Sequence, residues 1–230
     1  MDIRNARPDE FDLVCDILVD GFFRDPILSP VFPDLSRRAA SLRGFFRVTA
    51  APARDAGTIL ISGDNGGVLV YMTPDTLRQT AERESQDRLC LQQECGADGS
   101  TAVAFMDALA ANHPTGPPHN YVFLLAVRHR LLGGYVGPHL VRHLVDLLDS
   151  EGMPAYAEVT NLIARDLAYV LGWQEMENSL QLPNGQRLWR LWRMANTSAG
   201  TATPAVSATD STSPQRIGTS CGTLQAYHQR

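Results

Sequence analysis

The hydrophobic pattern at the start of the chain predicts one strand and two helices. Residues 3–6 form a short strand, and residues 7–22 place apolar side chains at the spacing of a helix. Three prolines in the next stretch, "FFRDPILSPVFPD", exclude a continuous helix, so we expect an ordered but irregular loop there. Ser36 can then cap a second helix that carries Leu42 and Phe46.

The remaining pattern predicts a hairpin, a helical insertion and then alternating strands and helices. The segment "TILISGDNGGVLVYMTP" has the glycine-rich turn of a β-hairpin, and the polar residues 75–114 are helical in character. "NYVFLLAV" is the most apolar segment, so we expect a central strand there. A helix, a strand, a helix and a closing hairpin follow over residues 138–150, 154–159, 161–172 and 173–193.

These elements fit one folded domain with a tail. A chain of 230 residues, 44% of them hydrophobic, can bury one substantial core. We therefore predict an α/β (α+β) domain over residues 1–194, with a mixed sheet, a central βαβα unit and helices on both faces. Residues 195–230 are rich in Ser, Thr, Ala and Gly without periodicity, and we expect a disordered tail.

Charge and cysteine content exclude several classes of function. The formal charge is −5 and no basic stripe is present, which argues against nucleic-acid binding. All 20 basic residues are arginine, which excludes lysine Schiff-base chemistry. The four cysteines show no metal-ligand spacing, so no metal is expected. A polar start and the lack of a membrane-length apolar run predict a cytoplasmic protein with no membrane partner. We also expect a small-molecule substrate and a monomer or homodimer, although the sequence does not indicate which of the two.

Several segments together carry a family resemblance. They include "DGFFRDPILSPVFPD", "GGVLVYMTP", "HPTGPPHNYVFLLAV", "EGMPAYAEVTN" and the closing "LGWQEMENSLQLPNGQRLWRLWR". In this order, over about residues 2–194, the chain resembles the GNAT superfamily of acetyltransferases, and within it the branch of puromycin N-acetyltransferase. The resemblance implies a GNAT-like sheet, acetyl-CoA as the acyl donor and an amine as the acceptor.

The resemblance also implies a cofactor site at the start of the helix that follows the central strand. In the family, a Q/RxxGxG/A loop wraps the pyrophosphate of CoA with backbone N–H groups. Here that loop is "LGGYVG", whose glycines would leave the N–H groups unshielded. The implied cofactor-binding residues are Leu125, Ala126, Val127, Leu132, Gly133, Gly134, Tyr135, Val136, Gly137 and Asn161.

Four positions depart from the family pattern. Leu132 replaces a polar residue and Tyr135 replaces a glycine, so we expect acetyl-CoA to bind weakly or not at all. Ala164 replaces an asparagine that contacts CoA, and Ala168 replaces a tyrosine that can protonate the leaving thiolate. Tyr169 follows one residue later, turned by roughly 100° on a helix, and is a candidate for that catalytic role only if the helix is rotated or distorted.

Five residues are candidates for catalysis: Glu158, Asp25, His119, Tyr156 and Tyr169. Glu158 lies mid-strand with Tyr156 on the same face by alternation, and a buried acid there would have a raised pKa that suits a general base. Asp25 lies in the loop that shapes the acceptor pocket in similar proteins, and His119 precedes the central strand. Each has an alternative: an exposed strand edge for Glu158, an Asx-type turn for Asp25, and a solvated loop for His119.

Three classes of function remain open at this point. The first is an acyl-CoA-dependent N-acyltransferase for a small amine, in natural-product tailoring or antibiotic resistance. The second is an enzyme of the same fold that no longer uses acetyl-CoA and performs acid–base chemistry as a cyclase, isomerase or lyase. The third is a noncatalytic binding protein. The intact acceptor-side segments favour the second class over the third.

Overall fold

The computed structural model describes residues 1–182 and 185–196. The tail expected from residue 195 lies outside the described residues from residue 197 onward, as does Cys221. No helix within the described ranges is both long enough and apolar enough to cross a bilayer. The described residues also contain no group of three or more side chains that could hold a metal ion.

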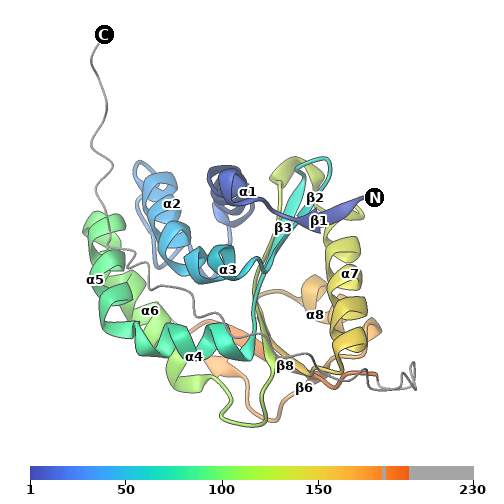
Figure 1. Cartoon of the computed structure of the whole chain (residues 1–230). Helices are drawn as coiled ribbons and strands as arrows, with labels where there is room; N and C mark the ends of the chain where they lie inside the picture. Colours follow the sequence, from blue (N-terminus) through green and yellow to red (C-terminus); the bar gives the residue numbers. More distant parts are fainter. Residues whose placement is uncertain (183–184, 197–230) are drawn as a thin grey trace, which may run out of the picture. The chain divides into compact units, whose positions relative to one another are not determined.

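An eight-stranded mixed sheet forms the centre of the domain (Figure 1). Its order is β1-β2-β3-β4-β5-β8-β6, and β7 pairs with β8. Among the strand pairs of the described residues, β4–β5 alone is parallel. The strands are β1 Ile3–Asn5, β2 Ile59–Ser62, β3 Gly67–Met72, β4 Asn120–Val127, β5 Ala155–Val159, β6 Gln174–Glu175, β7 Leu180–Gln181 and β8 Arg187–Arg193. The segment "NYVFLLAV" is therefore the central strand, as its composition predicts.

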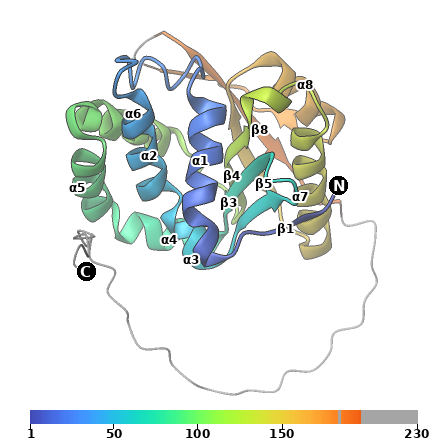
Figure 2. The same ribbon diagram turned by 90° about the horizontal axis from the view of Figure 1, so that it is seen from above.

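Helices cover both faces of the sheet, as the alternation of elements predicts (Figures 1 and 2). One face carries six helices, and the other carries two that pack on the central strands. The six are α1 Phe11–Phe22, α2 Arg38–Thr49, α3 Ala51–Ala56, α4 Pro74–Glu82, α5 Glu84–Glu94 and α6 Gly99–Asn112; the two are α7 Val136–Glu151 and α8 Leu162–Val170. The insertion expected to be helical over residues 75–114 is formed by α4, α5 and α6.

The start of α2 differs from the sequence-based expectation. Ser36 does not cap this helix, which begins at Arg38. Instead Asp34 accepts hydrogen bonds from the Ser36 N–H at 2.9 Å and from its hydroxyl at 2.6 Å. Asp34, two residues before Ser36, thus forms an Asx-type turn through its carboxylate, and α2 begins after this turn.

Arg38 fixes the irregular loop between α1 and α2. Its guanidinium is buried and donates to three backbone carbonyls, those of Phe32 at 2.6 Å, Pro33 at 3.0 Å and Phe23 at 3.2 Å. These bonds satisfy carbonyls that no regular structure would satisfy. The loop is therefore tied at both ends to the first residue of α2.

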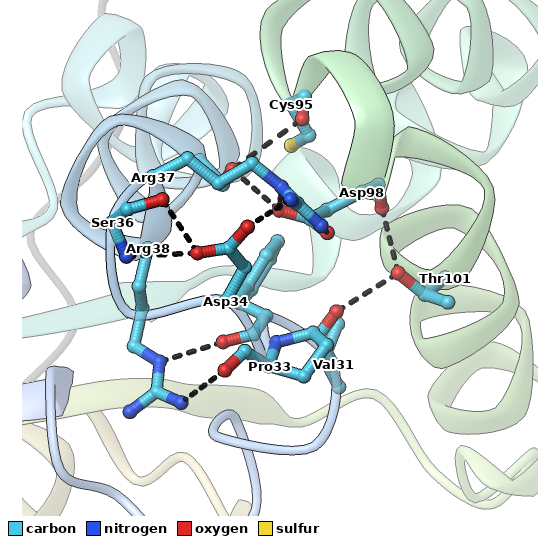
Figure 3. Close-up of polar contacts among 11 residues, drawn as sticks. Val31, Pro33, Asp34, Ser36, Arg37, Arg38, Cys95, Asp98 and Thr101 are labelled. Atoms are coloured by element: carbon cyan, nitrogen blue, oxygen red, sulfur yellow. Dashed lines mark hydrogen bonds and ion pairs between the residues drawn. The ribbon is translucent and has the colours of Figure 1, made fainter.

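The helical insertion holds the same loop from the other side (Figure 3). Thr101 donates to the Val31 carbonyl at 2.9 Å. Asp98 is buried and pairs with Arg37 at 2.9 Å, and Arg37 also pairs with Asp34. The insertion thus acts as a support for the loop that carries Asp25.

Candidate active site

The parallel strands β4 and β5 separate after a short paired stretch. They pair at Asn120–Ala155, Tyr121–Tyr156 and Val122–Ala157, and nothing further along is paired between them. A bulge at this point shifts the register of β4 against β3 and leaves Phe123 without a partner residue. Beyond Val122, the edge of β4 that faces β5 therefore opens onto a gap between the strands, and its peptide groups are free to bind a ligand.

A cavity of about 160 Å³ lies at this opening. Its lining is mostly apolar, and its charged side chains are Asp25 and Glu158. Alternation along β5 directs Glu158 and Thr160 to the face covered by α1 to α6, and Ala157 to the face covered by α7 and α8. The carboxylates therefore lie on one side of the opening.

Glu158 is held by three neighbours. The Tyr156 hydroxyl donates to its Oε1 at 2.7 Å, the Tyr121 side chain also hydrogen-bonds to it, and Arg190 lies directly opposite in the β5–β8 pair. Burial raises the pKa of Glu158, and these three groups only partly offset that rise. A carboxyl group with a raised pKa inside a cavity is suited to accept and return a proton.

Asp25 has both a structural contact and a face toward the cavity. Its Oδ1 accepts from the N–H groups of Ile27 at 2.8 Å and Leu28 at 3.0 Å, so the Asx-type turn is present. Its Oδ2 accepts from the Thr160 hydroxyl at 3.4 Å across the cavity. Burial raises the pKa of Asp25 as well. The sequence thus placed Asp25 and Glu158 in one site, and the structure brings them together through Thr160.

The loop expected to bind a pyrophosphate lies beside the same opening. Gly133 has φ +79°, a conformation that favours glycine, and α7 begins at Val136. At the start of α7 the N–H groups of Val136 and Gly137 have no acceptor within the helix, so they are available to an anion. Pro138 has no N–H, and the N–H of His139 donates to the Tyr135 carbonyl at 3.0 Å. Leu132 and Tyr135 are 60% and 78% exposed, and the Tyr135 ring packs edge-on against His139.

Helix α8 supplies the remaining side of the opening. Asn161 caps this helix by accepting from the Ala164 N–H at 2.9 Å. Ala164 and Ala168 line the cavity, so the two positions that depart from the family pattern face the site with no polar side chain.

Comparisons with protein families and with curated proteins give no match for this chain. Solved structures do match. A Corynebacterium glutamicum protein described as histone acetyltransferase HPA2 and related acetyltransferase is 22% identical with a TM-score of 0.63, over 86% of this chain and 98% of that one. Arylalkylamine N-acetyltransferase 2 of Aedes aegypti is 16% identical with a TM-score of 0.53, over 85% and 99%. The PaiA N-acetyltransferase of Thermoplasma acidophilum, in complex with coenzyme A, is 7% identical with a TM-score of 0.51, over 84% and 98%.

The chain has the GNAT acetyltransferase fold. In this GNAT fold, the opening between β4 and β5, the glycine loop and α7 are adjacent, which is the arrangement that the family resemblance implies.

Three expected catalytic residues, Tyr156, Tyr169 and His119, do not line the cavity of the GNAT fold. Tyr156 is buried and reaches the site through its hydrogen bond to Glu158. Tyr169 lies on the exposed side of α8, and its hydroxyl donates to Glu175 at 2.7 Å. His119 is buried, not solvated, and its Nε2 lies 3.1 Å from Nε2 of His113. His119 packs against the rings of Tyr156 and His113, and His113 packs against Tyr121, so His119 reaches the site through other residues and does not contact it directly.

Sequence analysis did not identify two residues that contact this network. Tyr121 hydrogen-bonds to Glu158, and Nε of Arg190 donates to the Tyr156 hydroxyl at 3.2 Å. Their placement depends on the register of β5 against β4 and β8, which has no signal in the local sequence. The local sequence gives one indication for Tyr121: alternation along "NYVFLLAV" places Tyr121 and Val122 on opposite faces of the sheet.

Proposed function

We propose that this chain is an acyl-CoA-dependent N-acyltransferase that acts on a small amine. The observation that carries the proposal is the Glu158 carboxylate in a cavity at the gap between β4 and β5, next to a glycine loop at a helix N-terminus. Neighbours of the same fold include an enzyme described as an arylalkylamine N-acetyltransferase. The resemblance to puromycin N-acetyltransferase supports a natural-product or drug-like amine as the acceptor.

Glu158 would act as the general base. An amine is an ammonium ion near neutral pH and must lose a proton before its nitrogen can attack a carbonyl carbon. Glu158 would take that proton, while Tyr121 and Tyr156 hold the carboxylate in one orientation through their hydroxyl groups. Asp25 adds a second negative charge on the same side, which attracts a cationic acceptor.

The residues present fit acetyl-CoA. Gly133 and Gly134 carry no side chain over the loop, and the N–H groups of Val136 and Gly137 at the start of α7 would bind the pyrophosphate. The free edge of β4 at Leu125–Val127 would hydrogen-bond to the pantetheine arm. When bound, the cofactor supplies an acyl group activated as a thioester. Because recognition of this kind uses backbone groups, the changes at Leu132 and Tyr135 leave its main donors in place.

The test measures transfer of the acetyl group from acetyl-CoA to a panel of primary amines. The release of free CoA thiol reports the rate of this reaction. Glu158→Gln keeps the shape of the side chain and removes its basicity, so we expect turnover to fall by about 10²–10⁴-fold. Glu177→Gln provides a matched control, because Glu177 does not line the cavity. Equal rates for Glu158→Gln and the unchanged protein would exclude Glu158 as the base.

A second candidate function is supported by α8. Ala164 and Ala168 face the cavity, so this wall offers neither an amide for CoA nor a phenol for the leaving thiolate. An enzyme that performs acid–base chemistry with Glu158 and Asp25, and that does not bind CoA, fits the same two carboxylates. Failure to bind any CoA derivative would favour this function.

A further inference from the structure

The cavity continues through the gap in the sheet to the side covered by α7 and α8. We call this part the α8 lobe. It contains no charged side chain, and it belongs to the core beneath the two helices. The residues that define the α8 lobe are Val122, Val141, Ala157, Leu167, Ala168 and Trp173.

Small side chains leave space in the α8 lobe. Ala157 is on β5 and Ala168 is on α8, and both are buried and line the cavity. Ala168 occupies the position where the family resemblance implies a tyrosine. Replacing a phenol ring by a methyl group without filling the space leaves room for ligand atoms at this point.

Trp173 supplies one polar group to the α8 lobe. This residue is 4% exposed and lines the cavity, and its Nε1 has no hydrogen-bond partner within the described part of the chain. An indole nitrogen is a donor only. Because a buried donor without a partner is costly, a ligand oxygen at this place would gain a hydrogen bond that the protein alone does not provide.

We propose that the α8 lobe binds the acyl chain of a donor thioester larger than acetyl, with a neutral oxygen on that chain accepting from Trp173. This inference rests on the proposed function and names the class of its acyl donor. The amine is assigned to the other side of the gap, because Asp25 and Glu158 are there and the lobe offers no partner to an ammonium group. The oxygen is neutral because the lobe has no cation for a carboxylate. The inference concerns binding and adds no covalent step.

The test compares the dissociation constants of acetyl-CoA, butanoyl-CoA and 3-oxobutanoyl-CoA by isothermal titration calorimetry on the full chain. Each buried methylene should tighten binding by about fourfold, so butanoyl-CoA, with two more methylenes, should bind about fifteenfold more tightly than acetyl-CoA. The oxygen of 3-oxobutanoyl-CoA should add about a further fivefold through Trp173.

Three variants separate the parts of the proposal. Ala168→Leu fills the lobe and should remove the advantage of both longer thioesters over acetyl-CoA. Trp173→Phe should keep the preference for butanoyl-CoA over acetyl-CoA and lose the preference for 3-oxobutanoyl-CoA over butanoyl-CoA. Val170→Leu is the control, because Val170 is on the same helix and 80% exposed. Thermal melting of each variant confirms that it folds.

The outcomes distinguish this inference from the proposed function. The α8 lobe is rejected if acetyl-CoA binds at least as tightly as both longer thioesters, or if the ranking survives in Ala168→Leu. In either case the proposed function stands, since acetyl-CoA still binds. If neither CoA nor any of its thioesters binds, the proposed function fails and this inference fails with it.

Discussion

The Tyr156 hydroxyl donates a 2.7 Å hydrogen bond to Oε1 of Glu158. Arg190 extends this contact, since its Nε donates to the same hydroxyl at 3.2 Å. Burial raises the pKa of Glu158, whereas Tyr156, Tyr121 and the charge of Arg190 lower it. Arg190 is thus a positioning residue, which acts on the proposed base through Tyr156 and through its charge.

Replacement of Arg190 should move the acidic limb of the pH–rate profile. A general base must be deprotonated to work, so kcat/KM falls as the pH drops through its pKa. Arg190→Gln removes a charge that lowers the pKa of Glu158, and the limb should therefore shift to higher pH. The matched control is Arg187→Gln, on the same strand but paired with Glu175. A limb that stays in place in Arg190→Gln would show that Glu158 does not set it.

Arg38 should be a large contributor to stability. Its buried guanidinium satisfies three loop carbonyls, and Arg38→Gln would leave at least two of them without a donor. We expect a loss of about 2–3 kcal/mol in the free energy of unfolding, measured by urea denaturation. Arg47→Gln, which breaks an exposed pair with Asp12, should cost less than about 1 kcal/mol. Similar losses in both variants would contradict the role given to Arg38.

The half-buried His113 should make the domain less stable in mild acid. Burial lowers the pKa of His113 from 6.5 to about 4. Between these two values the unfolded chain binds a proton that the folded chain does not, so stability is full above about pH 6.5 and falls as the pH drops toward 4. One such proton changes the free energy of unfolding by at most about 1.4 kcal/mol per pH unit.

His113→Gln should therefore flatten the dependence of stability on pH, measured by urea denaturation at pH 7 and at pH 5. His139→Gln is the control, because His139 is exposed. An unchanged slope in His113→Gln would mean that other groups cause the acid sensitivity.

Removal of the C-terminal segment should leave the domain intact. Residues 197–230 are rich in Ser, Thr, Ala and Gly, and from this composition we expect them to add little apolar surface to the core. A chain that ends at residue 196 should melt at the same temperature and keep any activity of the full chain. A drop of several degrees in Tm would show that the segment contributes to folding.

The sequence predicted the features that depend on local pattern. Alternation placed Glu158 and Tyr156 on one face of β5, and the apolar run placed β4 at the centre of the sheet. The prolines predicted the loop that carries Asp25, and the insertion was predicted to be helical. Each of these follows from neighbours within a few residues along the chain.

Features that depend on register and on helix rotation could not be predicted in the same way. Tyr121 and Arg190 reach Glu158 and Tyr156 only because three strands pair in a particular register. Tyr169 is the exception, because the turn of roughly 100° between neighbouring helical residues already implied that it points away when Ala168 is on the inner face. Ser36 does not cap α2 because its hydroxyl donates to Asp34, a contact that the local sequence does not distinguish from a cap.

The central claim, that this chain uses an acyl-CoA, is tested most directly by calorimetric titration with acetyl-CoA of the unchanged protein and of Tyr135→Gly. We predict saturable binding at one site with a dissociation constant above about 1 µM, because Leu132 and Tyr135 depart from the family loop. Binding should tighten in Tyr135→Gly, because the family loop has a glycine at this position and a glycine lets the backbone approach the phosphate closely. The absence of saturable binding in both proteins would contradict the claim.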